Sequence, residues 1–198
     1  MKLKLFALAL TALLPCLAAS SDADPGKSLG SPSAPIRIEV FSDFECPACK
    51  GLHERILPSL MTDYVIPGKV FLVSREFPLP MHQYSREAAA YATAAARVGK
   101  YQQVADALFQ NQVAWAANGK VWDAVANVLT PVEAKKVQLL AKDPSVMSSM
   151  DRDVAAGKAA GINQTPTMFI TRGTSRYPLA GTVNYNLLRS MLDGLLAK

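Results

Sequence analysis

Two cysteines one helical turn apart, Cys46 and Cys49, constrain this chain more than any other feature of its sequence. The residues from 36 to 42, just before them, form a short apolar run rich in β-branched and aromatic side chains, which predicts a buried strand. Pro47 suits the first position of a helix, because its missing N–H is not needed there. The pattern therefore predicts a strand, a turn, and a helix that begins at the cysteine pair.

A cysteine at the N-terminus of a helix differs chemically from one in the helix interior. Unpaired N–H groups and the helix dipole favour a negative charge, so the pKa of Cys46 is expected to fall below the free value of about 8.5. Cys49 would lie on the same helical face, close enough to attack a mixed disulfide at Cys46. We therefore predict a redox-active pair, with Cys46 as the nucleophile and Cys49 as the resolving thiol.

Two other uses of a cysteine pair remain open on the sequence alone. A structural disulfide would close so short a loop that it would constrain the unfolded chain very little. A zinc site needs four ligands, and apart from the pair the chain offers only Cys16, His53 and His82. Both histidines are expected to be surface or helix-packing residues, and we predict no metal and no other cofactor.

Residues 1–19 have the layout of a secretory signal peptide. A basic start precedes an apolar run that is too short to span a membrane, and small residues follow it. The remainder would then occupy the periplasm or cell envelope, a compartment that permits disulfides. Cys16 leaves a lipid anchor open, although Pro15 before it fits that processing poorly.

The charge of the chain argues against a nucleic-acid partner. The full chain has a formal net charge of +5, and removal of a leader that holds Lys2 and Lys4 and no acids would leave +3. The basic residues are dispersed and form no cluster interleaved with aromatic residues. The chain that remains without the leader is long enough for one domain with an ample core, and we expect a monomer.

The rest of the chain predicts an alternation of strands and helices. Residues 20–35 are rich in Ser, Pro and Gly and are expected to form a flexible linker. We then expect a strand over 69–77, a block of three or four Ala-rich helices over 85–150 and a further helix over 145–160. Two short strands over 167–172 and 176–180 and a final amphipathic helix from Asn184 onward complete the prediction. Asp151 and Asp153 are expected on a solvated helix face.

The chain resembles the DsbA-like thiol–disulfide oxidoreductases of bacterial cell envelopes. Four segments carry the resemblance, which covers nearly all of the chain after the leader: Phe41 to Cys49, Arg75 to Leu79, Ala107 to Gln112 with Trp115, and Gly161 to Thr167. The cysteine pair after a strand and the late Thr-Pro-Thr are specific in combination. The resemblance implies an α/β, thioredoxin-like fold with an inserted all-helical domain.

The resemblance also implies how the chain is divided and where substrate binds. Residues 36–83 would form the first part of the thioredoxin-like domain, 84–145 the helical insertion, and 146–198 the second part. In this family the proline that matches Pro166 has a cis peptide bond and packs against the cysteine pair. Thr165 and Pro166 are therefore expected to form a substrate-binding loop that faces the pair; a trans proline that starts a strand is the alternative.

The function implied by the resemblance is the oxidation of cysteine pairs in unfolded or reduced exported proteins. A membrane redox partner would reoxidise the dithiol. Ala48 stands where the strongest oxidants carry His, so Pro47 and Ala48 are expected to tune the pair to a potential between about −120 mV, as in DsbA, and about −270 mV, as in thioredoxin. A reductase or isomerase of the same fold and a non-enzymatic metal-binding carrier are the alternatives.

Proton transfer is the step for which this chain departs from its relatives. Many of them place a buried acid six residues before the first cysteine, where this chain has Val40 with Glu39 beside it. If Glu39 faces the other side of the strand, the proton must pass through Glu45, Asp43 or water. Glu45 is otherwise expected to point to solvent.

Overall fold

The computed structural model describes residues 24–197. The predicted signal peptide and Cys16 lie outside these residues. Within the described range, none of the helices combines the length and the apolar character that crossing a membrane requires.

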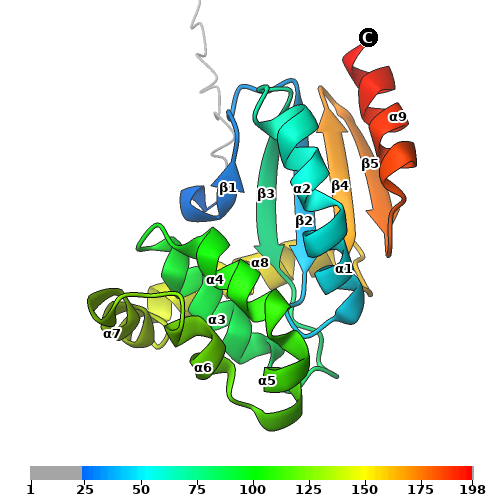
Figure 1. Ribbon diagram of the computed structural model, residues 1–198. Helices are drawn as coiled ribbons and strands as arrows, with labels where there is room; N and C mark the ends of the chain where they lie inside the picture. Colours follow the sequence, from blue (N-terminus) through cyan, green and yellow to red (C-terminus); the bar gives the residue numbers. More distant parts are fainter. Residues whose placement is uncertain (1–23, 198) are drawn as a thin grey trace, which may run out of the picture.

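A five-stranded mixed sheet forms the centre of the molecule (Figure 1). Its strands, in spatial order, are β1 (Ser28–Leu29), β3 (Val70–Glu76), β2 (Ile36–Ser42), β4 (Thr167–Arg172) and β5 (Ser175–Ala180). β2 and β3 run parallel, with Ser42 opposite Glu76, and the other neighbouring pairs are antiparallel. The last residues of β2 and β3 therefore meet at one edge of the sheet, and the cysteine pair follows β2 there.

Helices cover both faces of this sheet (Figure 1). One face carries α1 (Pro47–Arg55), α2 (Leu57–Leu60) and α9 (Tyr185–Leu196), and the other carries α8 (Pro144–Ala159). Ile38 of β2 packs with Leu52 and Leu192 on the first face, while Phe41 packs with Phe169 and Val154 on the second. Because both faces are covered, β2 is apolar along most of its length, as its sequence predicts.

Five helices between β3 and α8 pack together at the end of the sheet where the cysteine pair lies (Figure 1). They are α3 (Ser85–Ala96), α4 (Tyr101–Gln110), α5 (Gln112–Asn118), α6 (Val121–Ala126) and α7 (Pro131–Leu140). The sequence predicted three or four helices over this stretch. The additional break falls at Asn111, whose side-chain amide and backbone N–H both donate to the carbonyl of Ala107, at 2.8 Å and 3.1 Å.

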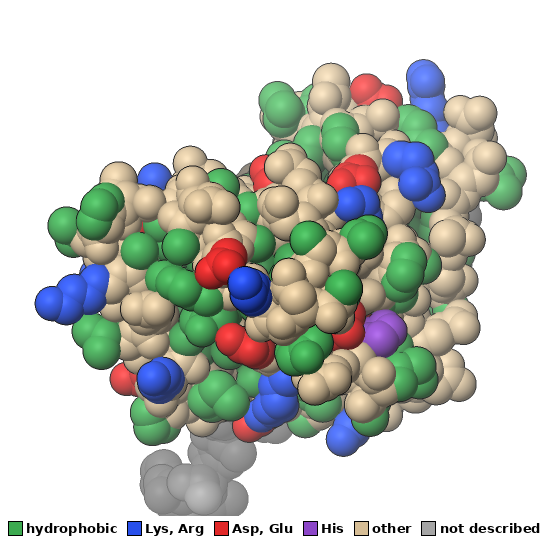
Figure 2. Space-filling model, turned by 60° about the horizontal axis from the view of Figure 1, so that its bottom comes forward, with side chains coloured by type: hydrophobic (Ala, Val, Ile, Leu, Met, Phe, Trp, Pro, Cys, Tyr) green, Lys and Arg blue, Asp and Glu red, His purple; other side chains and the backbone are tan. Residues whose placement is uncertain are grey.

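The surface at this end of the molecule is mixed in character (Figure 2). Lys and Arg side chains lie singly among acidic and apolar ones, and the face shown carries no continuous basic area. This distribution agrees with the dispersed basic residues of the sequence.

Residues 24–29 lie within the stretch 20–35 that the sequence predicts to be a flexible linker, but they are part of the fold. Asp24 caps a short 3₁₀ turn, Pro25–Lys27, and β1 then pairs with β3, with Leu29 opposite Leu72. The Lys27 side chain is 1% exposed and forms an ion pair with Asp153. Ladder hydrogen bonds and this buried charge hold the segment, and neither is visible in its composition.

Asp153 is buried, which corrects the expectation of a solvated face. Its carboxylate contacts Lys27 and the guanidinium of Arg75 (2.9 Å) and accepts from the N–H of Glu76 (3.2 Å). Asp151 is exposed, as expected, and pairs with Arg86. Two residues along an α-helix turn through about 200°, so the two carboxylates point in nearly opposite directions.

Candidate active site

Cys46 lies directly before α1, as the sequence predicts. It is the N-cap residue, with an extended backbone (φ −77°, ψ 120°), and Pro47 follows as the first residue of the helix. Cys46 is 7% exposed and Cys49 is fully buried, and both are free thiols. The pair therefore has one sulfur near the surface and one in the core.

The two thiols differ strongly in acidity. The pKa of Cys46 is lowered to about 5, chiefly because the Cys49 thiol donates a hydrogen bond to it, and the side chain of Thr165 and the N–H groups of Cys49 and Ala48 lower it further. Burial raises the pKa of Cys49 well above its ordinary value, and the hydrogen bond to Cys46 adds to this effect. At neutral pH, Cys46 is therefore the thiolate and Cys49 the thiol.

The Thr165–Pro166 peptide bond is cis, as predicted, and this loop faces Cys46. As a thiol, Cys46 donates to the carbonyl of Thr165, at 3.4 Å. The Thr165 hydroxyl is buried and has no hydrogen-bond partner among residues 24–197 while Cys46 is a thiol. It is available to donate to Cys46 once that sulfur is a thiolate, and in this way it favours the charged form and lowers the pKa. The N–H of Gly181 donates to the carbonyl of Pro166 (2.7 Å), which ties the loop to the end of β5.

Asp43 organises the turn between β2 and α1. Its carboxylate is 1% exposed and accepts from the N–H groups of Glu45 (2.8 Å) and Leu79 (2.7 Å) and from the hydroxyl of Ser85. His82 Nδ1 lies 2.8 Å from the same carboxylate. From the sequence, Asp43 is only a possible proton carrier and His82 only a surface or packing residue. The one sequence signal for the structural role of Asp43 is its place in the turn predicted between the strand and the helix.

The helical block also holds the turn that carries Cys46. Glu45 does not point to solvent, which corrects our expectation, since its carboxylate accepts from the N–H of Tyr84 (2.7 Å) at the start of α3. Such a position is favourable for an acid, because helix N-termini attract negative charge. Gln112 donates to the carbonyls of Phe44 (2.7 Å) and Cys46 (3.0 Å). The sequence identified Gln112 only as part of a segment of the family resemblance.

Glu39 lies on the sheet face opposite to Cys49. Burial alone would raise its pKa, but hydrogen bonds and charge from Arg75 and Arg37 lower the pKa below its usual value. The Nη2 atom of Arg75 lies 2.7 Å from its Oε1 atom. Glu39 is therefore an ionised, ion-paired carboxylate that does not reach the cysteine pair.

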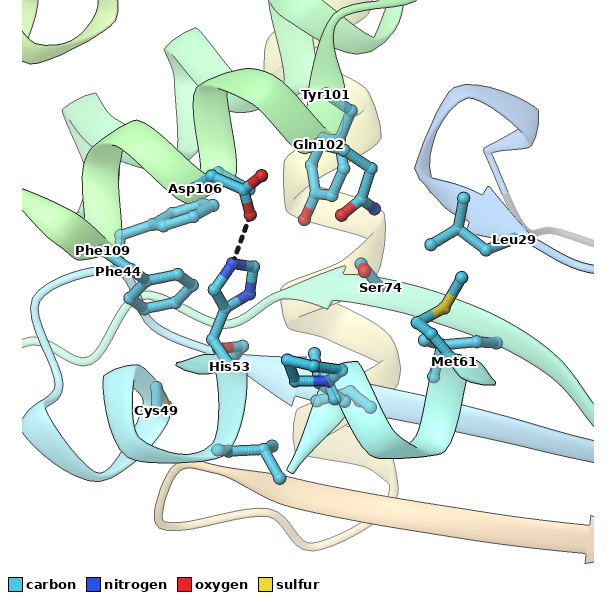
Figure 3. A pocket seen from close by; sticks show the side chains of 17 residues that line it. Leu29, Phe44, Cys49, His53, Met61, Ser74, Tyr101, Gln102, Asp106 and Phe109 are labelled. Atoms are coloured by element: carbon cyan, nitrogen blue, oxygen red, sulfur yellow. Dashed lines mark hydrogen bonds and ion pairs between the residues drawn. The ribbon is translucent and has the colours of Figure 1, made fainter. Parts of the chain in front are cut away.

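A cavity of about 140 Å³ lies behind Cys49, on the face of the sheet that α1 covers (Figure 3). Apolar side chains from β2, β3, α1, α2 and α4 form most of its wall. The polar groups in the wall are Ser42, Cys49, His53, Ser74, Tyr101, Gln102 and Asp106. His53 Nε2 lies 2.7 Å from Asp106 Oδ1, and its ring packs against Phe109, with 4.6 Å between ring centroids. His53 thus packs between helices, as expected, and also lines a cavity shared with Cys49.

Solved structures of DsbA proteins share this fold. Alpha-DsbA1 of Wolbachia pipientis superposes with a TM-score of 0.70 at 21% identity, over 85% of this chain and 89% of that chain. BdbD of Bacillus subtilis gives 0.70 at 21% identity, over 87% and 93% of the two chains. The predicted thioredoxin-like fold with an inserted helical block is therefore confirmed.

Curated relatives match shorter parts of the chain. A probable disulfide bond formation protein D of Bacillus cereus is 42% identical over 52 residues, which are 26% of this chain and 24% of that protein. A putative protein-disulfide oxidoreductase of Rickettsia typhi is 26% identical over 140 residues, 68% of this chain and 50% of that protein. The match thus spans about a quarter to a half of the length of these relatives.

The family model described as Thioredoxin matches residues 22–180, which include the cysteine pair, the helical block and the cis-proline loop. Because this match extends over most of its length, the chain belongs to the thioredoxin family.

Proposed function

We propose that this protein is a thiol–disulfide oxidoreductase that oxidises cysteine pairs in unfolded or reduced exported proteins. One observation carries the proposal. Two thiols one helical turn apart have pKa values shifted in opposite directions, and the more acidic thiol, Cys46, faces the cis-proline loop. A thiolate that is stabilised in this way is a good leaving group, which is what a disulfide donor requires.

The reaction begins with the disulfide form of the pair. A substrate thiolate attacks the sulfur of Cys46, the bond between Cys46 and Cys49 breaks, and Cys49 takes up a proton. A second substrate thiolate then attacks the substrate sulfur of the mixed disulfide, and Cys46 leaves as a thiolate. The substrate loses two electrons and gains a disulfide, while the pair gains the two electrons.

The substrate is expected to bind beside Cys46, at Thr165 and Pro166. The acidity of Cys46 favours the reduced form of the pair, so electrons should flow from substrate to protein. Recycling then requires a membrane redox partner that accepts these electrons. The proposal places a monomer in the periplasm or cell envelope, exported by residues 1–19 and with a possible lipid anchor at Cys16, and it involves no nucleic acid.

Ala48 is the observation that favours a second candidate, a reductase of the same fold. An alanine at this position adds no polar side chain next to the Cys46 sulfur, so the thiolate depends on Cys49, Thr165 and backbone N–H groups. A metal-binding carrier has less support, because residues 24–197 contain no group of three or more His, Cys, Asp or Glu side chains placed to hold an ion.

The deciding experiment is the equilibrium of the pair with glutathione buffers, measured by alkylation of the free thiols. A disulfide donor should have a potential above about −180 mV, the value of protein disulfide isomerase, whereas a potential near the −270 mV or so of thioredoxin would indicate a reductase. The Ala48→His variant should be more oxidising than the wild type, because a polar and potentially cationic neighbour stabilises the thiolate.

A further inference from the structure

The proposed function creates a proton-transfer problem at Cys49. This sulfur is fully buried, and burial raises its pKa well above the ordinary value. A bare thiolate at this position is therefore costly, although Cys49 is the leaving group when substrate attacks Cys46. The exchange needs a group that supplies a proton to Cys49 and takes it back when the pair is reoxidised.

The carboxylates of β2, of the end of β3 and of the turn before α1 already have other partners. Asp43 and Glu45 accept hydrogen bonds from backbone N–H groups that hold the turn and the start of α3. Glu39 lies on the opposite sheet face with Arg75. Glu76 is 1% exposed and accepts from the hydroxyl of Tyr101 (2.9 Å), so it does not exchange protons directly with water.

The cavity behind Cys49 connects it to a different group, His53. The two residues are one turn apart on α1, where side chains lie about 5–6 Å from each other, and both line the cavity. Figure 3 shows the His53 ring between Cys49 and Asp106. The cavity, of about 140 Å³, has room for several water molecules, since each occupies about 30 Å³ in the liquid. Ser42 and Ser74 in its wall offer hydroxyl groups to such water.

His53 is also held in one orientation and reaches solvent. Its Nε2 atom lies 2.7 Å from Asp106 Oδ1, and because a carboxylate only accepts, Nε2 is the donor and Nδ1 is left to exchange a proton. The side chains of His53 and Asp106 are 16% and 53% exposed. The charged or titratable groups around this dyad are Asp106 and Tyr101 of α4 and Cys49, Lys50 and Glu54 of α1; the cavity wall from β2, β3 and α2 adds none.

We propose that His53, positioned by Asp106, carries the proton of Cys49 through this cavity. When a substrate thiolate attacks Cys46, the S–S bond breaks, its electron pair stays on Cys49, and the imidazolium of His53 supplies a proton through water. During reoxidation, Cys49 attacks the mixed disulfide at Cys46 and returns its proton to neutral His53. Asp106 is a positioning residue, which keeps Nε2 protonated and stabilises the imidazolium.

The test is a single-turnover reaction of the oxidised full chain with reduced glutathione between pH 5 and pH 8, a range over which histidine side chains change charge. Acid quenching and alkylation give the rate, which is then divided by the concentration of glutathione thiolate. In the wild type this corrected rate should fall as pH rises. His53→Gln should lose this pH dependence and react at least tenfold more slowly at low pH, as expected for removal of a general acid.

Three further measurements separate proton transfer from structure. Asp106→Asn should weaken the pH dependence, whereas Asp151→Asn, the same change at an exposed ion pair, should leave it intact. Imidazole in the buffer should restore the rate of His53→Ala. The pKa of Cys46, measured by alkylation, should stay within a few tenths of a unit in His53→Gln, because the contacts that lower it do not involve His53.

Two outcomes would contradict the inference, and they are distinguishable. If the wild type exchanges disulfides and His53→Gln keeps its rate and pH profile, proton transfer through His53 is wrong and the proposed function stands. If the wild type itself does not exchange disulfides with glutathione, the proposed function fails and this inference fails with it.

Discussion

Two regions of the molecule bury ionisable groups, and they treat them in opposite ways. On the α8 face, a buried charge cluster of Lys27, Glu39, Arg75 and Asp153 pairs each charge with an opposite one. At the start of α1, the interactions that lower the pKa of Cys46 most are hydrogen bonds, from the Cys49 thiol, the Thr165 side chain and backbone N–H groups.

This contrast suggests that one region serves stability and the other serves reactivity. A charge that is balanced by ion pairs stabilises one arrangement of the chain, and removal of one partner is costly. A thiolate that is held by hydrogen-bond donors can leave and return as bonds to sulfur form and break. We therefore expect changes in the charge cluster to alter stability, and changes around Cys46 to alter reactivity.

The largest effect is expected from removal of Cys46. Cys46→Ala should abolish disulfide transfer to a reduced model protein, because the attacked sulfur is gone. Cys49→Ala, the matched control, should still form a mixed disulfide with substrate but not resolve it, which mass spectrometry of the adduct would detect. If Cys46→Ala retained transfer through Cys49, the assignment of the nucleophile would be wrong.

In the charge cluster, Asp153→Asn should lower the free energy of unfolding by about 3–5 kcal/mol, as is typical when one partner of a buried ion pair is removed. The reason is that Lys27 then faces a neutral amide in a site where it is 1% exposed. Urea unfolding measures the effect. Asp151→Asn, which removes an exposed carboxylate from the same helix, should change stability by less than about 1 kcal/mol.

Glu76 should make stability fall as pH rises. Burial raises its pKa to about 7 from 4.5, so between these values the folded chain binds a proton that the unfolded chain has released. The folded state therefore loses up to about 3 kcal/mol as pH increases through this window. Urea unfolding at pH 5 and pH 8 should show Glu76→Gln gaining stability relative to the wild type at the higher pH. An equal difference at both values would contradict the raised pKa.

The smallest effect is expected at Thr165. Thr165→Val removes the hydroxyl available to the Cys46 thiolate and should raise the pKa of Cys46 by about one unit, the worth of one hydrogen bond to a charged group. The pH dependence of alkylation by iodoacetamide measures this, with the wild-type midpoint expected near the pKa of about 5. Thr93→Val, at another buried hydroxyl without a partner among the described residues, should leave the midpoint unchanged.

Local sequence signals determined much of the fold. The strand over 36–42 and the helix start at Pro47 lie where the sequence predicts them, and the last helix, predicted from Asn184 onward, starts at Tyr185 with Asn184 as its N-cap. Each of these elements depends on residues that are close in sequence. The strand depends on its β-branched and aromatic residues, the first helix on the missing N–H of proline, and the last helix on a side chain that caps backbone N–H groups. The redox-active pair and the cis bond before Pro166 were also predictable, the first from spacing and the second from the family resemblance.

Only the tertiary structure decided which charged groups are buried and what lies behind Cys49. Lys27 and Asp153 are 126 positions apart, and β1 joins the sheet only because β3 offers it an edge. The cavity that Cys49 shares with His53 exists because α1, α4 and the sheet meet there, and Asp106 reaches His53 from another helix. Burial and electrostatics depend on segments that pack together from distant parts of the chain. The sequence therefore determined where the thiols stand and that Cys46 is the acidic one, whereas the packing that buries Cys49 raised the pKa of that thiol.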